Sequence, residues 1–192
     1  MDLLTAIESR ASAVRMTAPG PSDSELQRIL AAGTLAPDHG RLAPWRFVVL
    51  SGTERGTLGQ AMADLQRRRD PDSSQAALDA EYAKAMRAPT IVVVACRAAK
   101  GHKVPEIEQV MAVAAATQNM ILAAFALGYH AMWKTGAAAY DEGVKQAVGL
   151  EPDDQIVAFL YLGTPTAPGT PRGAQLDGKI LSPVRPSASA GS

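Results

Sequence analysis

The chain has little cysteine, few aromatic residues and no excess of charge, and each shortage excludes a class of protein. Cys96 is the only cysteine among 192 residues, so no intramolecular disulfide can form and the reducing cytoplasm is the expected location. Nineteen basic residues balance nineteen acidic ones, which removes the electrostatic signature of nucleic-acid or anionic-membrane binding. The three histidines show no metal-ligand spacing, so we expect no metal site.

Motifs for nucleotide-binding folds and for membrane insertion are lacking as well. No Gly-x-Gly-x-x-Gly follows a strand pattern and no P-loop is present. The amino end has no basic segment followed by an apolar run, so we expect no signal peptide. Residues 110–127 are apolar enough to suggest a membrane span, but polar residues 117–119 interrupt them. A helix that is apolar nearly all round is more typical of a buried core helix, and we expect no membrane contact.

Local patterns predict helices and a few strands without strict strand–helix–strand alternation. Expected helices cover residues 2–9, 22–36, 53–69, 75–87, 105–127 and 140–148, and expected strands cover 45–50, 90–96, 130–133 and 156–162. This order predicts one α+β domain over residues 1–192, with helices flanking a small sheet. From residue 163 onward Pro, Gly, Ser and Ala predominate, which predicts an extended C-terminal arm whose last residues are disordered.

The most informative segment is residues 36–45, which places two prolines, a glycine, a histidine and an arginine between a helix and a strand. Loops that hold rigid and polar residues in this way usually shape a site on a scaffold. Upstream, Arg10 and Ser12 supply a cation and a hydroxyl donor that suit a phosphate. Arg10 could instead be a cation at a helix C-terminus, and we favour the phosphate role. Asp38 is expected to fix the loop through a local backbone hydrogen bond.

These motifs resemble those of the nitroreductase-like FMN flavoproteins, and above all a compact bacterial subgroup of NAD(P)H nitroreductases. The resemblance covers about residues 1–165 and depends on the order and spacing of motifs that are weak singly. They are Arg10-Ala11-Ser12, the Ala-Pro…Pro-Trp element of residues 36–45, His102-Lys103-Val104-Pro105, the turn at residues 128–136, and the final strand and exit at residues 159–165. Asp38, Arg41 and Ala43 stand where the wider family has Ser, Asn and Gln.

The resemblance implies a nitroreductase-like layered fold with a mostly antiparallel central sheet, and it implies FMN and NAD(P)H as cofactors. It assigns flavin binding to Arg10, Ala11, Ser12, Leu35, His39, Trp133, Lys134, Thr135 and Gly136. Arg10 and Ser12 would hold the phosphate, with Arg15 and Arg172 as further candidates. Lys134 and the turn around it would lie beside the ring.

A purely structural role is the alternative for several of these residues. Trp133 could instead be a core aromatic residue at a strand end, and Lys134 could be an exposed lysine. His39 is either a turn residue or a contact to the flavin of a partner subunit, with Leu35 as an apolar contact at the same edge; we favour the partner contact. Cys96, in mid-strand, is expected to be inert core. A lid over the flavin is placed at residues 65–82.

By the same resemblance, the chain is expected to be an FMN oxidoreductase that reduces nitroaromatic, quinone or similar acceptors with NAD(P)H in ping-pong turnover. FMN would carry the hydride, so no catalytic residue is expected from the chain itself. The helix at 105–127 has more apolar surface than one side can bury, and we expect a homodimer with flavin sites at the interface. Two alternatives are a flavin-storage protein without turnover and a flavin-free interaction domain. The choice between NADH and NADPH stays open.

Overall fold

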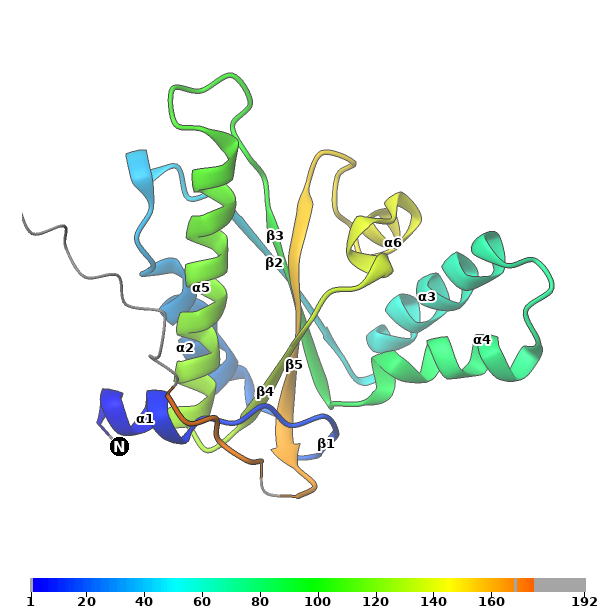
Figure 1. The fold of residues 1–192 in the computed structure, drawn as a ribbon, viewed down its shortest axis with the longest axis horizontal. Coiled ribbons are helices and arrows are strands. Elements are labelled where there is room, and N and C mark those ends of the chain that lie inside the picture. The colour runs from blue at the N-terminus through cyan, green and yellow to red at the C-terminus, as the bar shows by residue number, and fades with distance from the viewer. Residues whose placement is uncertain (1, 168, 175–192) are drawn as a thin grey trace, which may run out of the picture.

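The computed structural model describes residues 2–167 and 169–174 (Figure 1). The disorder expected at the end of the arm lies outside the described residues. The helices are α1 (Leu3–Ser9), α2 (Asp23–Thr34), α3 (Arg55–Arg69), α4 (Gln75–Tyr82), α5 (Glu106–Ala126) and α6 (Glu142–Ala147). The strands are β1 (Met16–Thr17), β2 (Trp45–Ser51), β3 (Thr90–Cys96), β4 (His130–Lys134) and β5 (Gln155–Pro165).

The five strands form one antiparallel sheet in which β5 pairs with three others. β3 lies between β2 and β5, and β5 pairs on its other side with β4 and, at its end, with β1. The helices α2 and α5 cover one face of the sheet, whereas α3, α4 and α6 lie beyond the other (Figure 1). This arrangement confirms the predicted α+β fold with helices around a small antiparallel sheet.

The central strand β3 shows why the sheet has two cores. Every residue of β3 is buried, as its continuous apolar run predicts. Successive side chains alternate between faces, so Ile91 and Val93 join the core beneath α3 and α6, while Val92 and Val94 join the core beneath α2 and α5. Cys96 ends the strand with no exposed surface, and burial raises the pKa of its thiol to about 11. The thiol is therefore protonated at neutral pH, in agreement with an inert core residue.

The long helix α5 packs antiparallel to α2 against the sheet. A side chain at Gly33 of α2 would place its Cβ 2.9 Å from Met120 Cγ, so glycine permits this close approach. α2 begins with the capping box that the sequence predicts, in which Ser22 and Glu25 bond each other's backbone N–H groups. Within the described residues, α5 alone has the length and apolarity of a membrane span. Its contacts with α2 and the sheet identify it as a core helix.

Several helix boundaries differ by a few residues from the sequence prediction. The helix expected at 140–148 begins at Glu142, because the Asp141 carboxylate accepts the Val144 N–H at 2.9 Å and caps it there. Tyr140 instead ends a short 3₁₀ helix and is 80% exposed. The helix expected at 75–87 stops at Tyr82 and continues as one 3₁₀ turn.

The last strand ends later than expected, and the arm therefore begins later too. β5 runs to Pro165 rather than to residue 162, because the two-residue strand β1 pairs with its end. β1 has too few residues to leave a recognisable sequence pattern. The arm therefore starts after residue 165.

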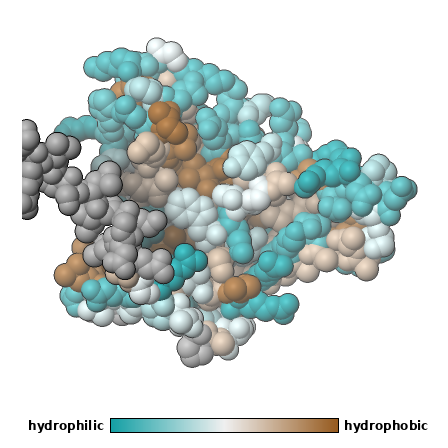
Figure 2. All heavy atoms as spheres, viewed as in Figure 1, coloured by the Kyte–Doolittle hydropathy of each residue, from teal (hydrophilic) through white to brown (hydrophobic). Residues whose placement is uncertain are grey.

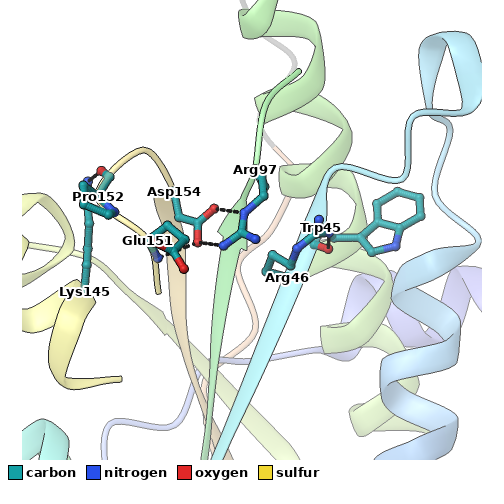
Figure 3. A network of polar contacts seen from close by, with 7 residues as sticks. All are labelled: Trp45, Arg46, Arg97, Lys145, Glu151, Pro152 and Asp154. Atoms are coloured by element: carbon teal, nitrogen blue, oxygen red, sulfur yellow. Dashed lines mark hydrogen bonds and ion pairs between the residues drawn. The ribbon is translucent and has the colours of Figure 1, made fainter. Parts of the chain in front are cut away.

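An ion pair between buried Asp154 and exposed Arg97 joins the end of β3 to the loop before β5 (Figure 3). The Arg97 guanidinium donates to both carboxylate oxygens of Asp154, at 2.7 and 2.6 Å, and the Glu151 N–H donates to the same carboxylate at 2.9 Å. Asp154 has no exposed surface, so these donors replace its hydration. The hydrogen bonds from Arg97 hold the pKa of Asp154 below its usual range.

Replacing Asp154 by asparagine should lower the free energy of unfolding by about 2 kcal/mol at pH 7, because the buried carboxylate would lose its charge-assisted hydrogen bonds. The folded-state pKa of Asp154 is depressed. Its contribution is therefore complete above the unfolded-state pKa of about 3.9 and disappears as the pH falls through the folded-state pKa. Urea unfolding at pH 7 and at decreasing pH measures this difference.

The matched control is Asp153→Asn, because Asp153 pairs with Lys100 at the surface at 2.7 Å. Its effect at pH 7 should be much smaller than that of the Asp154 variant. Equal effects of the two variants, or an Asp154 effect that persists unchanged at pH 3, would contradict the assigned role.

Candidate functional site

A cleft of about 360 Å³ lies between the sheet and the α3–α4 hairpin. Phe159 and Tyr161 of β5 form its floor. One wall is the segment that leaves β4, residues 134–138, and the other comes from α3 and from residues 81–87. Its volume lies in the range of roughly 300–1,000 Å³ that ligand sites occupy. The cleft is thus large enough for a small organic ligand.

The wall after β4 is formed by the alternation of side chains along β4 and by the turn at Gly136 that follows it. Lys134, Thr135 and Gly136 line the cleft. Trp133 faces the opposite side of the sheet and packs against the core beneath α5. Its indole N–H donates to the Val157 carbonyl at 3.0 Å. Gly136 has a φ of 73°, a conformation that L side chains rarely adopt, and it turns the chain into the following 3₁₀ helix.

The opposite wall contains functional candidates that the sequence analysis did not identify, namely Arg69, Glu81, Lys84 and Arg87. The three consecutive arginines that end α3 differ in their surroundings. Arg67 and Arg68 pair with Asp64 and Asp141, whereas Arg69 lines the cleft. The segment 65–82, predicted to be a lid, consists of the end of α3, a loop and α4, and part of it lines the cleft.

The predicted phosphate-binding segment runs beside β4. Arg10 caps the end of α1 with its backbone N–H, and the next residues extend alongside the strand. Ser12 forms a parallel bridge with Ala131, and the Ala13 N–H donates to the Ala131 carbonyl at 3.4 Å. Lys134 follows Ala131 by three residues, about 10 Å along a strand. The exposed hydroxyl of Ser12 therefore lies about 10 Å along β4 from Lys134 at the cleft, and Arg10 precedes Ser12 by two residues. This spacing suits a ligand with a flat ring and an anionic tail.

The C-terminal arm returns to this same segment. The Thr166 N–H donates to the Arg15 carbonyl at 3.4 Å. A side chain at Gly169 would place its Cβ 2.5 Å from Ala11 Cβ and 3.4 Å from the Ser12 carbonyl. Glycine at 169 thus allows the arm to lie directly on residues 11–12. Arg172, a further phosphate candidate, is three residues beyond this contact.

Neither Leu35 nor His39 lines the cleft. Leu35 follows α2 and is exposed, and His39 lies far from Arg10. His39 Nδ1 is 2.6 Å from Glu108 Oε2, in the first turn of α5. β4 begins at the other end of α5, where the rings of His130 and Phe125 are 5.4 Å apart. The 17 residues from Glu108 to Phe125 span about 25 Å of helix. One copy of the chain therefore cannot bring His39 and the 10–12 segment to the same small ligand.

The loop that carries His39 has an unusual backbone. Asp38 Oδ2 accepts the Ala43 N–H at 2.6 Å, which is the local hydrogen bond that the sequence analysis predicts. Gly40, Arg41 and Ala43 all have positive φ, at 79°, 55° and 48°. Only glycine adopts such angles without strain. The carboxylate of Asp38 helps to hold two non-glycine residues in this conformation.

Sequence comparison identifies the family. A model of the nitroreductase family matches residues 7–164. The chain belongs to the nitroreductase family. The Escherichia coli protein named "Putative NAD(P)H nitroreductase YdjA" is 38% identical over 165 residues, which cover 86% of this chain and 89% of that protein. A "Putative NAD(P)H nitroreductase" of Haemophilus influenzae is 33% identical over 165 residues and covers 85% of this chain and 89% of its own length.

Solved structures agree with this membership and confirm the fold. A nitroreductase-like family protein from Bacillus cereus superposes with a TM-score of 0.79 at 22% identity, covering 96% of this chain and 97% of its own. A "putative nitroreductase in complex with FMN" from Desulfovibrio desulfuricans has a TM-score of 0.74 at 26% identity, covering 95% and 97%. The resemblance seen in the sequence and the nitroreductase-like layered fold are both confirmed.

Proposed function

We propose that this family member is an FMN-dependent oxidoreductase that uses NAD(P)H to reduce nitroaromatic, quinone or similar small acceptors. Curated relatives named NAD(P)H nitroreductases and a structural neighbour in complex with FMN support the proposal. The observation that supports it most is that Ser12, two residues after Arg10, pairs with the strand β4 whose end lines a ligand-sized cleft. The single, buried cysteine fits a cytoplasmic location.

The residues present fit FMN. Arg10 and Ser12 donate charge-assisted and hydroxyl hydrogen bonds suited to its phosphate. Lys134 would offset negative charge on the ring, and the backbone turn at Thr135 and Gly136 would border it. Tyr161, whose pKa burial raises to about 12, keeps a neutral hydroxyl on the cleft floor. FMN supplies the hydride chemistry when it is bound, so the chain needs to bind, orient and shield rather than react.

We infer a homodimer in which each flavin site uses both copies. His39 lies too far from Arg10 to serve the same flavin within one chain, so a second copy would bring His39, and with it Leu35, to the flavin. The outer side of α5 carries exposed apolar residues one turn apart, Ile107 at 64% and Met111 at 62% exposure. Figure 2 shows apolar surface gathered over the upper part of α5. Burying such a stripe against a second copy would remove apolar surface from water.

The purified protein should be yellow with bound FMN, and anaerobic addition of NADH or NADPH should bleach the visible flavin band. The bleaching should be reversed by a nitroaromatic or quinone acceptor. Absorption spectra recorded before and after each addition measure this sequence. Persistent colour after both donors would favour a flavin-storage protein, and a colourless protein that retains no added FMN would refute flavin binding.

Gly169→Ala should weaken FMN binding about tenfold, because the added Cβ displaces the arm from Ala11 and Ser12. Gly173→Ala is the matched control, since a Cβ there meets no atom within 4 Å. Fluorescence titration of the FMN-free protein gives both dissociation constants. If the two variants bind FMN equally well, the arm has no role in closing the phosphate site.

Met111→Glu should produce monomers, because a charge placed in the apolar stripe of α5 opposes its burial. FMN affinity should fall together with dimerisation, since each site loses the partner's contribution. Sedimentation and FMN titration measure the two effects. Gln60→Glu, which adds the same charge on the exposed side of α3, should change neither. A monomeric protein that still holds FMN at full occupancy would show that the site is not shared.

A further inference from the structure

The cleft has a marked excess of positive charge. Arg69, Lys84, Arg87 and Lys134 line it, and Glu81 is the only acidic residue among its lining residues. The chain as a whole is neutral, so this concentration is a local feature. A cation-lined concave surface attracts anionic ligands more strongly than an open surface does.

Two of these cations have partners or roles already. Lys84 pairs with Glu81, three residues before it, which neutralises both. Lys134 is assigned to the ring under the proposed function. Arg69 and Arg87 remain, and no ion pair within residues 2–167 and 169–174 includes either guanidinium. Both are therefore available to a ligand.

Arg87 is the better fixed of the two. It is half-buried, and its carbonyl accepts the Met16 N–H at 2.8 Å, so its backbone is tied to the strand edge. Arg87 and the floor residue Tyr161 line the same cleft, and the charge of Arg87 lowers the pKa of Tyr161, which burial raises. Arg69 lies at the end of α3 in the same wall as Arg87 and is exposed.

Guanidinium groups suit carboxylate and phosphate because their planar forks donate two parallel hydrogen bonds. We propose that Arg87 and Arg69 bind an anionic group, carboxylate or phosphate, on the molecule that exchanges electrons with the flavin. The proposal rests on the proposed function. The anion could belong to the acceptor, as an aromatic carboxylate, or to the donor, as the 2′-phosphate that distinguishes NADPH from NADH.

Matched substrate pairs test the proposal on the holoenzyme. We expect a higher kcat/KM for 4-nitrobenzoate than for 4-nitrobenzamide, or for NADPH than for NADH. Arg87→Gln and Arg69→Gln should each reduce that ratio, by about tenfold for Arg87→Gln and less for exposed Arg69. The loss should appear mainly in KM, and Arg87→Lys should restore part of it. Arg67→Gln is the control: Arg67 is two residues from Arg69 but pairs with Asp64 outside the cleft.

Equilibrium binding of benzoate and benzamide, measured by calorimetry with and without FMN, provides a readout independent of turnover. Benzoate should bind more tightly, and the glutamine variants should remove the difference. A change confined to the acceptor pair identifies a carboxylate as the bound group, and one confined to the donor pair identifies the 2′-phosphate.

Unchanged substrate ratios and unchanged benzoate binding in both glutamine variants would overturn the proposal. If such protein still holds FMN and is bleached by NAD(P)H, the proposed function stands and only the anion site is wrong. If the protein holds no FMN, the proposed function fails, and benzoate binding to the FMN-free protein still decides whether the cleft selects anions. Because Arg69 is exposed, its variant keeps the test valid even if Arg87→Gln does not fold.

Discussion

The two-residue alternation of side chains along β4 and β5 is the constraint on which the rest of the structure depends. It sends Phe159 and Tyr161 to the cleft and Leu160 to the core beneath α5. The same alternation directs Lys134 to the cleft and Trp133 to the α5 core, where its indole finds a carbonyl. Because β4 and β5 are paired in register, a slip of one residue would exchange the cleft lining with the core. The site is therefore as well specified as the core itself.

The length of α5 explains why a second copy is proposed. The helix holds the His39 loop at one end and the start of β4 at the other, and a rigid helix does not shorten. The segment that suits a phosphate and the loop that carries His39 are therefore held at opposite ends of a helical span of about 25 Å in each copy. Two antiparallel copies related by a two-fold axis can bring opposite ends together, which is what an isologous interface does. The exposed apolar stripe on α5 gives such an interface its driving force.

Sequence patterns predicted the elements whose signals are local. The bounds of β3 and the start of α2 at its capping box depend on neighbouring residues, and both lie within a residue of their predicted positions. Element ends decided by distant partners were missed, as when β1 extends β5. The opposite wall of the cleft was missed for the same reason. Arg69, Lys84 and Arg87 become site residues only because the α3–α4 hairpin packs across from β4, and nothing in their local sequence distinguishes them from solvated cations.

The backbone of the loop that carries His39 is strained, and the residues at its strained positions do not relieve that strain. Arg41 and Ala43 both have positive φ, and asparagine tolerates this conformation better than either residue. Each non-glycine residue in that region costs of order 1 kcal/mol or more. The short bond from Asp38 to the Ala43 N–H offsets part of this cost without removing it. Glycine or asparagine at these positions would relax the loop. Its strained conformation is therefore better explained by the position it gives His39 than by a contribution to stability.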